Sequence, residues 1–293
     1  KEYTFEACGE TLDMAQLQEI WEAKLEPVYP YRKAGPTVEP ITGSLTAPAA
    51  PKIGVAKPKV IIPVFPGTNC EYDTAKAFAR AGADPEILVI RNLTPADVTA
   101  SCEALVKAID NSQIVMLPGG FSGGDEPDGS AKFIASFFRN PEVTEAVRRL
   151  LQQRDGLMLG ICNGFQALIK LGLVPYGDIR PITAYDPTLT FNTIGRHQSM
   201  LVRTRIASTG SPWLSKCAVG DEHTVAISHG EGRFVAPQEV LDTLIKNGQV
   251  ATQYVDLTGT PTMDQRCNPN GSVLAIEGIT SPDGRVFGKM GHS

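Results

Sequence analysis

Residues 157–169 read LMLGICNGFQALI, and they place a thiol at the joint between two kinds of local structure. The apolar residues before Cys162 have the character of a buried strand, whereas the residues after it have helical character. Gly160 and Gly164 flank the thiol in the pattern Gly-x-Cys-x-Gly. This pattern is the cysteine counterpart of the nucleophile elbow, in which glycines allow a sharp turn where a Cβ atom would strike a neighbouring strand or helix.

The elbow lies within a longer alternation of strands and helices that begins at Lys59. Apolar runs predict strands over residues 59–65, 86–90, 113–118 and 156–161. The intervening patterns predict helices over residues 73–81, 95–109, 131–153 and 163–171, with Gly172 closing the last one. Short apolar strands between helices are typical of a parallel sheet that is covered on both faces. Further strand patterns predict a β-rich C-terminal half, at residues 199–207, 223–230, 249–255, 271–280 and 285–290.

A cysteine in this setting is either a nucleophile or an ordinary core thiol. At a helix N-terminus the helix dipole and the unpaired N–H groups favour the thiolate and lower the pKa of the thiol. The N–H of Asn163 would then face the oxyanion formed when Cys162 attacks a carbonyl group. A second glycine loop, LPGGFSGGDE (117–126), also follows a predicted strand, and Gly120 in it is a candidate second oxyanion donor. The two loops together favour the nucleophile.

A cysteine nucleophile needs a base, and four histidines are available. His229 in ISHGEGRF and His292 in VFGKMGHS each follow a predicted strand, while His197 and His223 lie in polar surroundings. Glu231 follows His229 by two residues, although HGEG at the end of a strand is also ordinary turn chemistry. The pattern by itself leaves open which of the first two histidines is the base.

The composition restricts the class of protein. The chain has 27 Lys and Arg against 32 Asp and Glu, a net charge of −5, whereas nucleic-acid-binding domains are typically basic. No run approaches the roughly 20 apolar residues that a membrane span needs, and the start KEYTFEACGE does not resemble a signal peptide. The six cysteines form no Cys-x-x-Cys pair, which indicates reduced thiols in a cytoplasmic protein without a zinc site. Cys70 lacks the glycine frame of the elbow, so we interpret it as a bystander.

The N-terminal part has a different character from the rest. Residues 11–26 have apolar positions at helical spacing, with Thr11 as the expected N-cap. Residues 27–58 contain seven prolines, which predicts an extended linker. A single helix on such a linker cannot bury a core of its own. We therefore expect residues 1–26 to belong to another domain or to pack onto the main one.

Four motifs resemble one enzyme family. GICNGFQ (160–166), LPGGFS (117–122), FPGTN (65–69) and SHGEGRF (228–234) together resemble the glutaminase domain of the phosphoribosylformylglycinamidine synthases. These domains are class I, triad-type glutamine amidotransferases, and the resemblance extends over about residues 59–293. It implies a flavodoxin-like, mostly parallel sheet with helices on both faces.

The resemblance also implies an activity and a set of residues. Cys162 would attack the side-chain amide of glutamine, release ammonia and form a thioester that water hydrolyses. The ammonia would pass to a synthase domain that uses ATP and Mg²⁺, whereas the glutaminase part needs no cofactor. His292 matches the base of the family, and the implied glutamine contacts are Phe121, Gln166, His229 and Glu231.

The resemblance further implies that residues 1–26 end a synthase domain, that 27–58 link it, and that 59–293 form a truncated glutaminase domain. The family motif is H-x-E, and the glutamate expected after Ser293 would complete the triad. We therefore expect this chain alone to be poorly active. Two alternatives are a stand-alone cysteine hydrolase, either a peptidase or a γ-glutamyl hydrolase, and a non-catalytic docking module.

Overall fold

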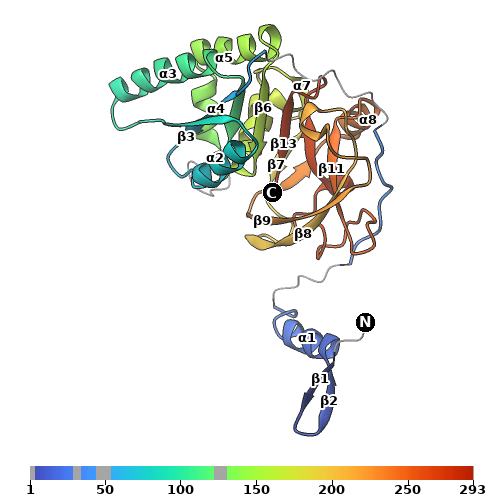
Figure 1. The fold of residues 1–293 in the computed structure, drawn as a ribbon. Coiled ribbons are helices and arrows are strands. Elements are labelled where there is room, and N and C mark those ends of the chain that lie inside the picture. Colours follow the sequence, from blue (N-terminus) through green and yellow to red (C-terminus); the bar gives the residue numbers. More distant parts are fainter. Residues whose placement is uncertain (1–3, 29–33, 44–53, 122–130, 293) are drawn as a thin grey trace.

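The computed structural model describes residues 4–28, 34–43, 54–121 and 131–292, and its main feature is a nine-stranded sheet (Figure 1). The strands follow the order β4-β3-β5-β6-β13-β12-β11-β8-β9. The first five are parallel: β4 (Asp84–Val89), β3 (Lys59–Val64), β5 (Ile114–Leu117), β6 (Leu157–Ile161) and β13 (Val286–Lys289). Taken in chain order, these five strands have the flavodoxin arrangement, with a switch of direction between β3 and β5. The α/β fold class is therefore confirmed.

The other half of the sheet is antiparallel. It contains β12 (Ile276–Thr280), β11 (Val250–Val255), β8 (Gln198–Ile206) and β9 (Glu222–His229). β13 is the boundary strand, because it pairs in parallel with β6 and antiparallel with β12. The β-rich C-terminal half expected from the sequence thus extends the same sheet instead of forming a separate one.

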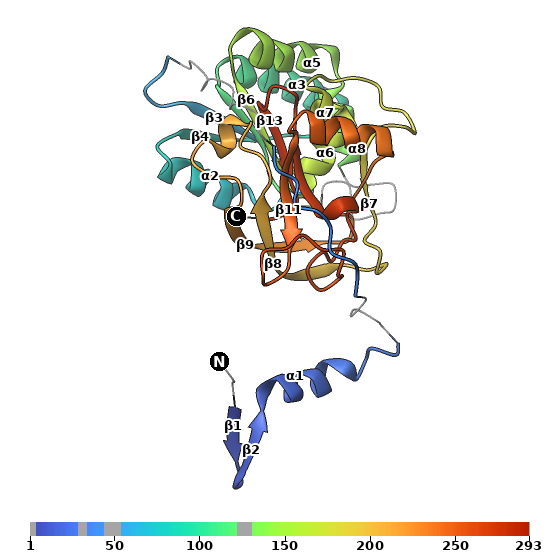
Figure 2. The ribbon, with the colours of Figure 1, turned by 90° about the vertical axis from the view of Figure 1, so that its right-hand side faces the viewer.

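Helices cover the two faces of the sheet unequally. The larger apolar core contains residues from six helices: α3 (Pro95–Asp110), α4 (Lys132–Phe138), α5 (Pro141–Arg148), α6 (Asn163–Leu171), α7 (Leu173–Tyr176) and α8 (Gln238–Lys246). On the other face, α2 (Glu71–Arg80) packs Phe78 against Val60 and Ile62 of β3. Figure 2 shows α2 and α8 on opposite sides of the sheet. Ile61 lies between Val60 and Ile62 in the sequence and joins the larger core, as the two-residue period of a strand requires.

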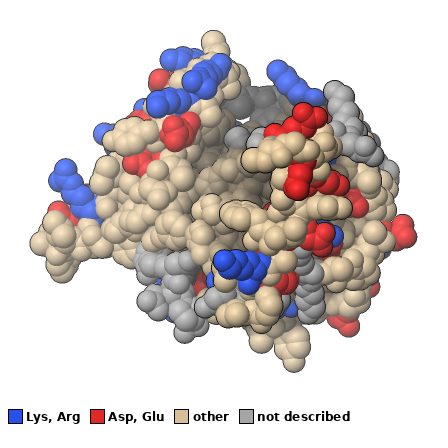
Figure 3. Space-filling model, turned by 90° about the horizontal axis from the view of Figure 1, so that it is seen from below, with Lys and Arg blue, Asp and Glu red and all other residues tan. Residues whose placement is uncertain are grey.

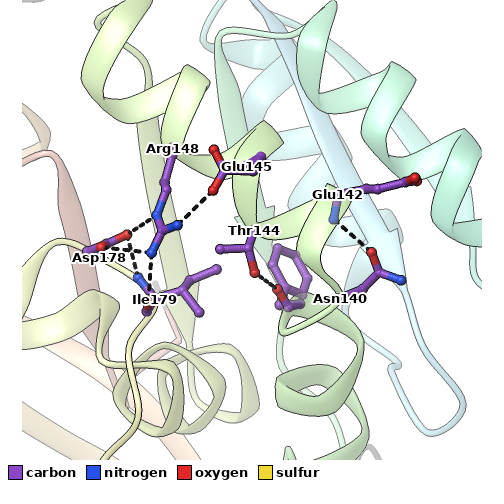
Figure 4. A network of polar contacts seen from close by, with 8 residues as sticks. Asn140, Glu142, Thr144, Glu145, Arg148, Asp178 and Ile179 are labelled. Atoms are coloured by element: carbon purple, nitrogen blue, oxygen red, sulfur yellow. Dashed lines mark hydrogen bonds and ion pairs between the residues drawn. The ribbon is translucent and has the colours of Figure 1, made fainter.

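Local sequence explains where several helices begin and end. Thr94 and Asp97 form a capping box at the start of α3, and Gly172 ends α6 with φ +84°. Arg148 joins the end of α5 to the segment after α7, because its guanidinium binds Asp178 at 2.8 Å and Glu145 at 2.7 Å (Figure 4). These contacts hold α5 to the segment that contains Asp178.

The predicted element positions agree with the structure to within a few residues, with several differences. The segment 131–153 contains α4, α5 and a π-helical turn, Arg149–Gln153. The strand predicted over 271–280 begins only at Ile276, after the 3₁₀ turn Val273–Ala275. The sequence did not predict α8 or the small sheet of β7 (Thr188–Thr190) and β10 (Arg233–Val235).

The N-terminal segment departs from its prediction. Thr11 does not cap a helix, because it lies in β2 (Glu10–Asp13), which pairs with β1 (Thr4–Ala7) as a hairpin. Asp13 is the N-cap instead, accepting a hydrogen bond from the N–H of Ala15 at 2.8 Å, and α1 runs over Met14–Ala23. The side chain of Trp21 on α1 is 80% exposed, and Figures 1 and 2 show the hairpin and α1 apart from the main body.

Part of the proline-rich linker is bound to the domain. Residues 34–43 run in extended form along it, and the N–H of Ile41 donates to the side chain of Gln253 at 2.8 Å. Arg205 donates to the carbonyl of Ile41 at 3.0 Å, and the side chain of Ile41 is buried in the larger core. We call residues 34–43 the strap.

The surface carries both signs of charge. Figure 3 shows Lys and Arg interspersed with Asp and Glu over a largely uncharged face. Among the residues that the structure describes, no helix is both long enough and apolar enough to cross a membrane.

Candidate active site

Cys162 occupies a strained turn between β6 and α6. Its backbone has φ +54° and ψ −107°, a conformation that residues other than glycine rarely adopt. The N–H of Cys162 donates to the carbonyl of Lys289 at 2.8 Å, and its carbonyl accepts from the N–H of Gln166 at 3.0 Å. The side chain is 3% exposed. Such strain persists only where the surrounding structure enforces it, which marks the turn as a candidate functional site.

Both glycines of the elbow are sterically required, as the sequence predicts. A Cβ atom on Gly160 would lie 2.6 Å from Leu168 and 2.7 Å from the backbone of Gly164. A Cβ atom on Gly164 would lie only 2.0 Å from the carbonyl oxygen of Leu117 on β5. The helix that carries Cys162 can therefore approach the sheet only because these positions have no side chain.

The second glycine loop lies beside the elbow, at the switch point between β3 and β5. The N–H of Phe121 donates to the carbonyl of Gly67 at 2.8 Å, and the N–H of Asn69 donates to the carbonyl of Gly119 at 3.4 Å. These two hydrogen bonds lie on either side of Gly120, and neither of them uses the N–H of Gly120. Gly120 has φ +134°, and a Cβ atom there would lie 2.5 Å from the carbonyl oxygen of Gly67.

His292 follows β13, the strand next to β6, so it leaves the same edge of the sheet as Cys162. Its N–H donates to the carbonyl of Ala226 at 2.8 Å. Its ring packs over Gly119, where a Cβ atom would lie 2.6 Å from His292 Cε1 and 3.3 Å from Cys70 Sγ. These three residues border a cavity of about 540 Å³ against α2. Burial and the positive charge of Lys289 lower the pKa of His292, while Glu277 acts in the opposite direction.

His229 lies inside the protein and not at the mouth of the site. Its ring is 2% exposed, and Nε2 is 2.8 Å from Oδ1 of Asn270. The amide nitrogen of Asn270 donates to the carbonyl of Gly232 and to the hydroxyl of Tyr254, so Oδ1 is the acceptor and His229 Nε2 carries the proton. Burial lowers the pKa of His229 to about 4, which keeps the ring neutral at physiological pH.

Gln166 joins the Cys162 helix to the loop that follows β9. Its Oε1 accepts from the side chain of Asn163 at 2.9 Å, and its Nε2 donates to the carbonyl of Glu231 at 2.6 Å. Gln166 and Glu231 are both buried, at 4% and 3% exposed. The structure therefore brings together four of the residues singled out in the sequence, Asn163, Gln166, His229 and Glu231, because His229 ends β9 directly before this loop.

Phe121 is the most exposed of the predicted site residues, at 37%. Its ring centroid lies 6.0 Å from that of His197, and His197 Nε2 is 2.9 Å from the hydroxyl of Ser228. The polar surroundings of His197 in the sequence had given no reason to place it here. Long-range pairing of β8 with β9 brings it beside the site.

Sequence reasoning missed the residues that support the loop. Asn192 donates to the carbonyl of His229 at 2.9 Å and accepts from the N–H of Gly232 at 3.2 Å. Asn270 binds the same loop from the other side, and Tyr254 and Glu277 are buried nearby. NPNG at 268–271 has the composition of an ordinary turn, so its sequence carried no signal of this contact.

The other cysteines do not share the elbow setting. None of the six cysteines forms a disulfide, and burial is the main cause that raises the pKa values of Cys70, Cys102, Cys217 and Cys267. A raised pKa disfavours the reactive thiolate, which supports the interpretation of Cys70 as a bystander. Within the described ranges, no group of three or more His, Cys, Asp or Glu side chains is arranged to hold a metal ion.

A strained cysteine turn, a glycine loop and a strand-end histidine at the carboxyl ends of parallel strands form the arrangement expected of a glutamine amidotransferase. A family model described as the CobB/CobQ-like glutamine amidotransferase domain matches residues 57–293. The chain belongs to this family.

Individual relatives agree with the motifs. The chain is 35% identical over 242 residues to phosphoribosylformylglycinamidine synthase subunit PurQ of Methanococcus maripaludis, covering 80% of this chain and 81% of that protein. It is 34% identical to the subunit of the same name from Aquifex aeolicus, covering 80% and 89%. A solved structure of PurLQS from Thermotoga maritima matches with a TM-score of 0.57 and 25% identity, covering 80% of this chain and 87% of that one. The resemblance inferred from the four motifs is confirmed.

Proposed function

We propose that this chain is the glutaminase part of a phosphoribosylformylglycinamidine synthase, in which Cys162 releases ammonia from glutamine. The observation that carries the proposal is the elbow itself, with Cys162 at φ +54° and hydrogen-bonded to the strand that leads to His292. The PurQ relatives support the same role. They do not favour a stand-alone peptidase or γ-glutamyl hydrolase, or a docking module without catalysis.

The proposed reaction has two steps. First, His292 accepts the proton of the Cys162 thiol, and the sulfur bonds to the amide carbon of glutamine. The amide nitrogen takes that proton from His292 and leaves as ammonia, so a γ-glutamyl thioester remains. Water then gives a proton to His292 and attacks the thioester carbon. The carbon–sulfur bond breaks, the sulfur takes that proton from His292 to become the thiol again, and glutamate is released.

The oxyanion formed in each step needs two donors. We assign the backbone N–H of Asn163, at the start of α6, and that of Gly120 in the glycine loop. The hydrogen bonds of Phe121 and Asn69 hold this loop while leaving the Gly120 N–H available. The N-terminal end of α6 adds the positive end of its dipole.

Four residues are proposed to form the glutamine site. Phe121 offers an exposed ring beside the elbow. Gln166, His229 and Glu231 form the buried side, and because both amide atoms of Gln166 bind within the protein, its role includes holding the loop in place.

The use of ammonia requires a synthase partner. We propose that ATP and Mg²⁺ act in that partner, where the oxygen of the formyl amide of formylglycinamide ribonucleotide is replaced by nitrogen. The chain itself needs no cofactor for glutamine hydrolysis, and we expect it in the cytoplasm. Residues 1–26 as part of the synthase, and 27–58 as the link to it, remain predictions.

The test is Cys162→Ser in the complete enzyme with its synthase. We expect glutamine-dependent amidine formation to be lost while ammonia-dependent formation is retained. Glutamine use that survives the substitution would refute the nucleophile. We also expect these 293 residues alone to hydrolyse glutamine slowly, because no partner orders the site, and steady-state assays of the separate chain measure this.

A further inference from the structure

Glu277 is a carboxylate buried inside the protein. It lies on β12, whose five residues are all buried, and its own exposed fraction is 1%. Taking a carboxylate out of water costs several kcal/mol unless hydrogen bonds and nearby charges compensate. A group of this kind inside a strand is therefore a candidate for a specific task.

The contacts of Glu277 lead to His292. Its Oε1 accepts the N–H of Gly291 at 2.6 Å, and its Oε2 accepts the hydroxyl of Thr252 at 2.5 Å. Gly291 directly precedes His292 and has no room for a side chain, since a Cβ atom there would lie 2.5 Å from Val225 and 3.0 Å from Oε1. The carboxylate thus holds the peptide that carries His292.

Charged and titratable groups face His292 from several elements. Lys289 lies on its own strand, Glu277 on β12 and His229 on β9, and Cys70 lies across Gly119 at the start of α2. Burial and Lys289 lower the pKa of His292, and Glu277 opposes them. Burial is the main cause that raises the pKa of Tyr254, and the charges of Glu277 and Cys162 add to it. Glu277 and Cys162 therefore act on the same buried side chain.

We propose that Glu277 is a further positioning residue of His292, in addition to the glutamate of the H-x-E motif: it holds the Gly291–His292 peptide and stabilises the imidazolium that forms when the proton of Cys162 is transferred. This inference rests on the proposed function in that His292 is the base. Glu277 makes no bond to substrate and exchanges no proton. It acts through the backbone and through its charge.

The test is Glu277→Gln, which keeps an acceptor oxygen for Gly291, removes the charge and replaces the acceptor of the Thr252 hydroxyl with an amide donor. With ¹³C-labelled histidine, NMR titration of His292 should move to lower pH by roughly half a unit or more. In the complex with the synthase, kcat for glutamine should fall about tenfold with little change in KM, because substrate contacts are intact. The matched control is Thr252→Val, which removes a neighbouring hydrogen bond but keeps the carboxylate, and it should leave the His292 titration unchanged.

An unchanged His292 titration in folded Glu277→Gln protein would overturn the proposal, even if stability fell. If that variant does not fold, ¹³C-labelled glutamate in the unmodified chain replaces it. The carboxyl signal of Glu277 is assigned by its change in Thr252→Val. Its chemical shift should change over the pH range in which His292 is protonated. A chemical shift that does not change in that range would refute the electrostatic interaction between Glu277 and His292. Failure of the proposed function is tested separately with His292→Asn in the complex. Full glutamine turnover by that variant would refute His292 as the base, whatever the titrations of the unmodified chain and of Glu277→Gln show.

Discussion

The parallel and antiparallel halves of the sheet contribute to the candidate site by different means. In the parallel half, Cys162 and Gly120 lie on loops directly after strands, and backbone geometry places them. In the antiparallel half, buried side chains such as Asn270 and Glu277 hold the loop after β9 and the peptide before His292. The position of the proposed nucleophile, Cys162, therefore depends on the absence of side chains, whereas the positions of His292 and of the loop after β9 depend on polar side chains.

β13 connects these two kinds of support. It receives the N–H of Cys162 from the parallel side and pairs with the strand of Glu277 on the antiparallel side. Small changes in either half should thus alter the positions of Cys162 and His292. Substitutions in each half can measure how different the two kinds of support are.

The largest effect is expected for Gly164→Ala, in the parallel half. The new Cβ atom would lie 2.0 Å from the carbonyl of Leu117, so α6 must move away from the sheet. We expect the free energy of unfolding to fall by about 4 kcal/mol or more, measured by urea denaturation. Gly82→Ala is the control, because Gly82 has φ +91° and open space around it, and it should cost only about 1 kcal/mol. Equal costs would show that the close approach of Gly164 to Leu117 does not govern the stability of the elbow.

The next effect is expected for Asn270→Ala, in the antiparallel half. The substitution removes one hydrogen-bond partner from each of three groups: the ring Nε2–H of His229, the carbonyl of Gly232 and the hydroxyl of Tyr254. Urea denaturation should show a loss of about 3 kcal/mol, and KM for glutamine in the complex should rise. The exposed Asn111→Ala, which loses one hydrogen bond to Lys107, should cost less than about 1 kcal/mol. A loss at Asn270 no larger than at Asn111 would contradict the role of the network.

A pH series tests the same network through His229. Its pKa is about 4 in the folded protein against 6.5 unperturbed, so between these values the unfolded state binds a proton that the folded state does not. Its contribution to stability is complete above pH 6.5 and is lost as the pH falls towards 4, by up to about 3 kcal/mol. Urea denaturation from pH 7 to 4.5 should therefore give a smaller slope for His229→Gln than for the unmodified chain. Identical slopes would mean that His229 is not buried in neutral form.

The smallest effect is expected for Ser272→Ala. The hydroxyl of Ser272 accepts from the N–H of Phe234 at 3.1 Å and donates to the carbonyl of Gly232 at 3.3 Å. It therefore binds the end of the loop after β9 and contacts neither His229 nor Glu231 through these bonds. We expect a loss of about 1 kcal/mol in denaturation and no change in kcat. A large fall in kcat with intact stability would place Ser272 nearer to the chemistry than the structure does.

Much of the parallel half could be predicted from the sequence. Its strands are short apolar runs, and its turns carry glycines whose spacing reports a sharp bend, as at Gly160 and Gly164. The helix α8 and the strands β7 and β10 were missed, because short amphipathic segments between turns resemble loops. Thr11 was misassigned because a good capping residue also suits a strand.

The site divides in the same way. Cys162, Gly120 and His292 stand next to recognisable strand ends, so local pattern was enough to single them out. Asn270 and Glu277 have no such context, and only the folding of distant segments gives them a role. The extended strap was expected, but its binding through Ile41 to Gln253 was not.

The sequence by itself determined the elbow, the alternation that builds a parallel sheet, and the enzyme family, because each depends on residues that are close together in the chain. Only the tertiary structure decided that His229 is buried and neutral, that Gln166 binds the 229–232 loop, and that Glu277 holds the peptide before His292. These facts depend on burial and on hydrogen bonds between segments far apart in sequence. Neither quantity is encoded in the residues on either side of a given position.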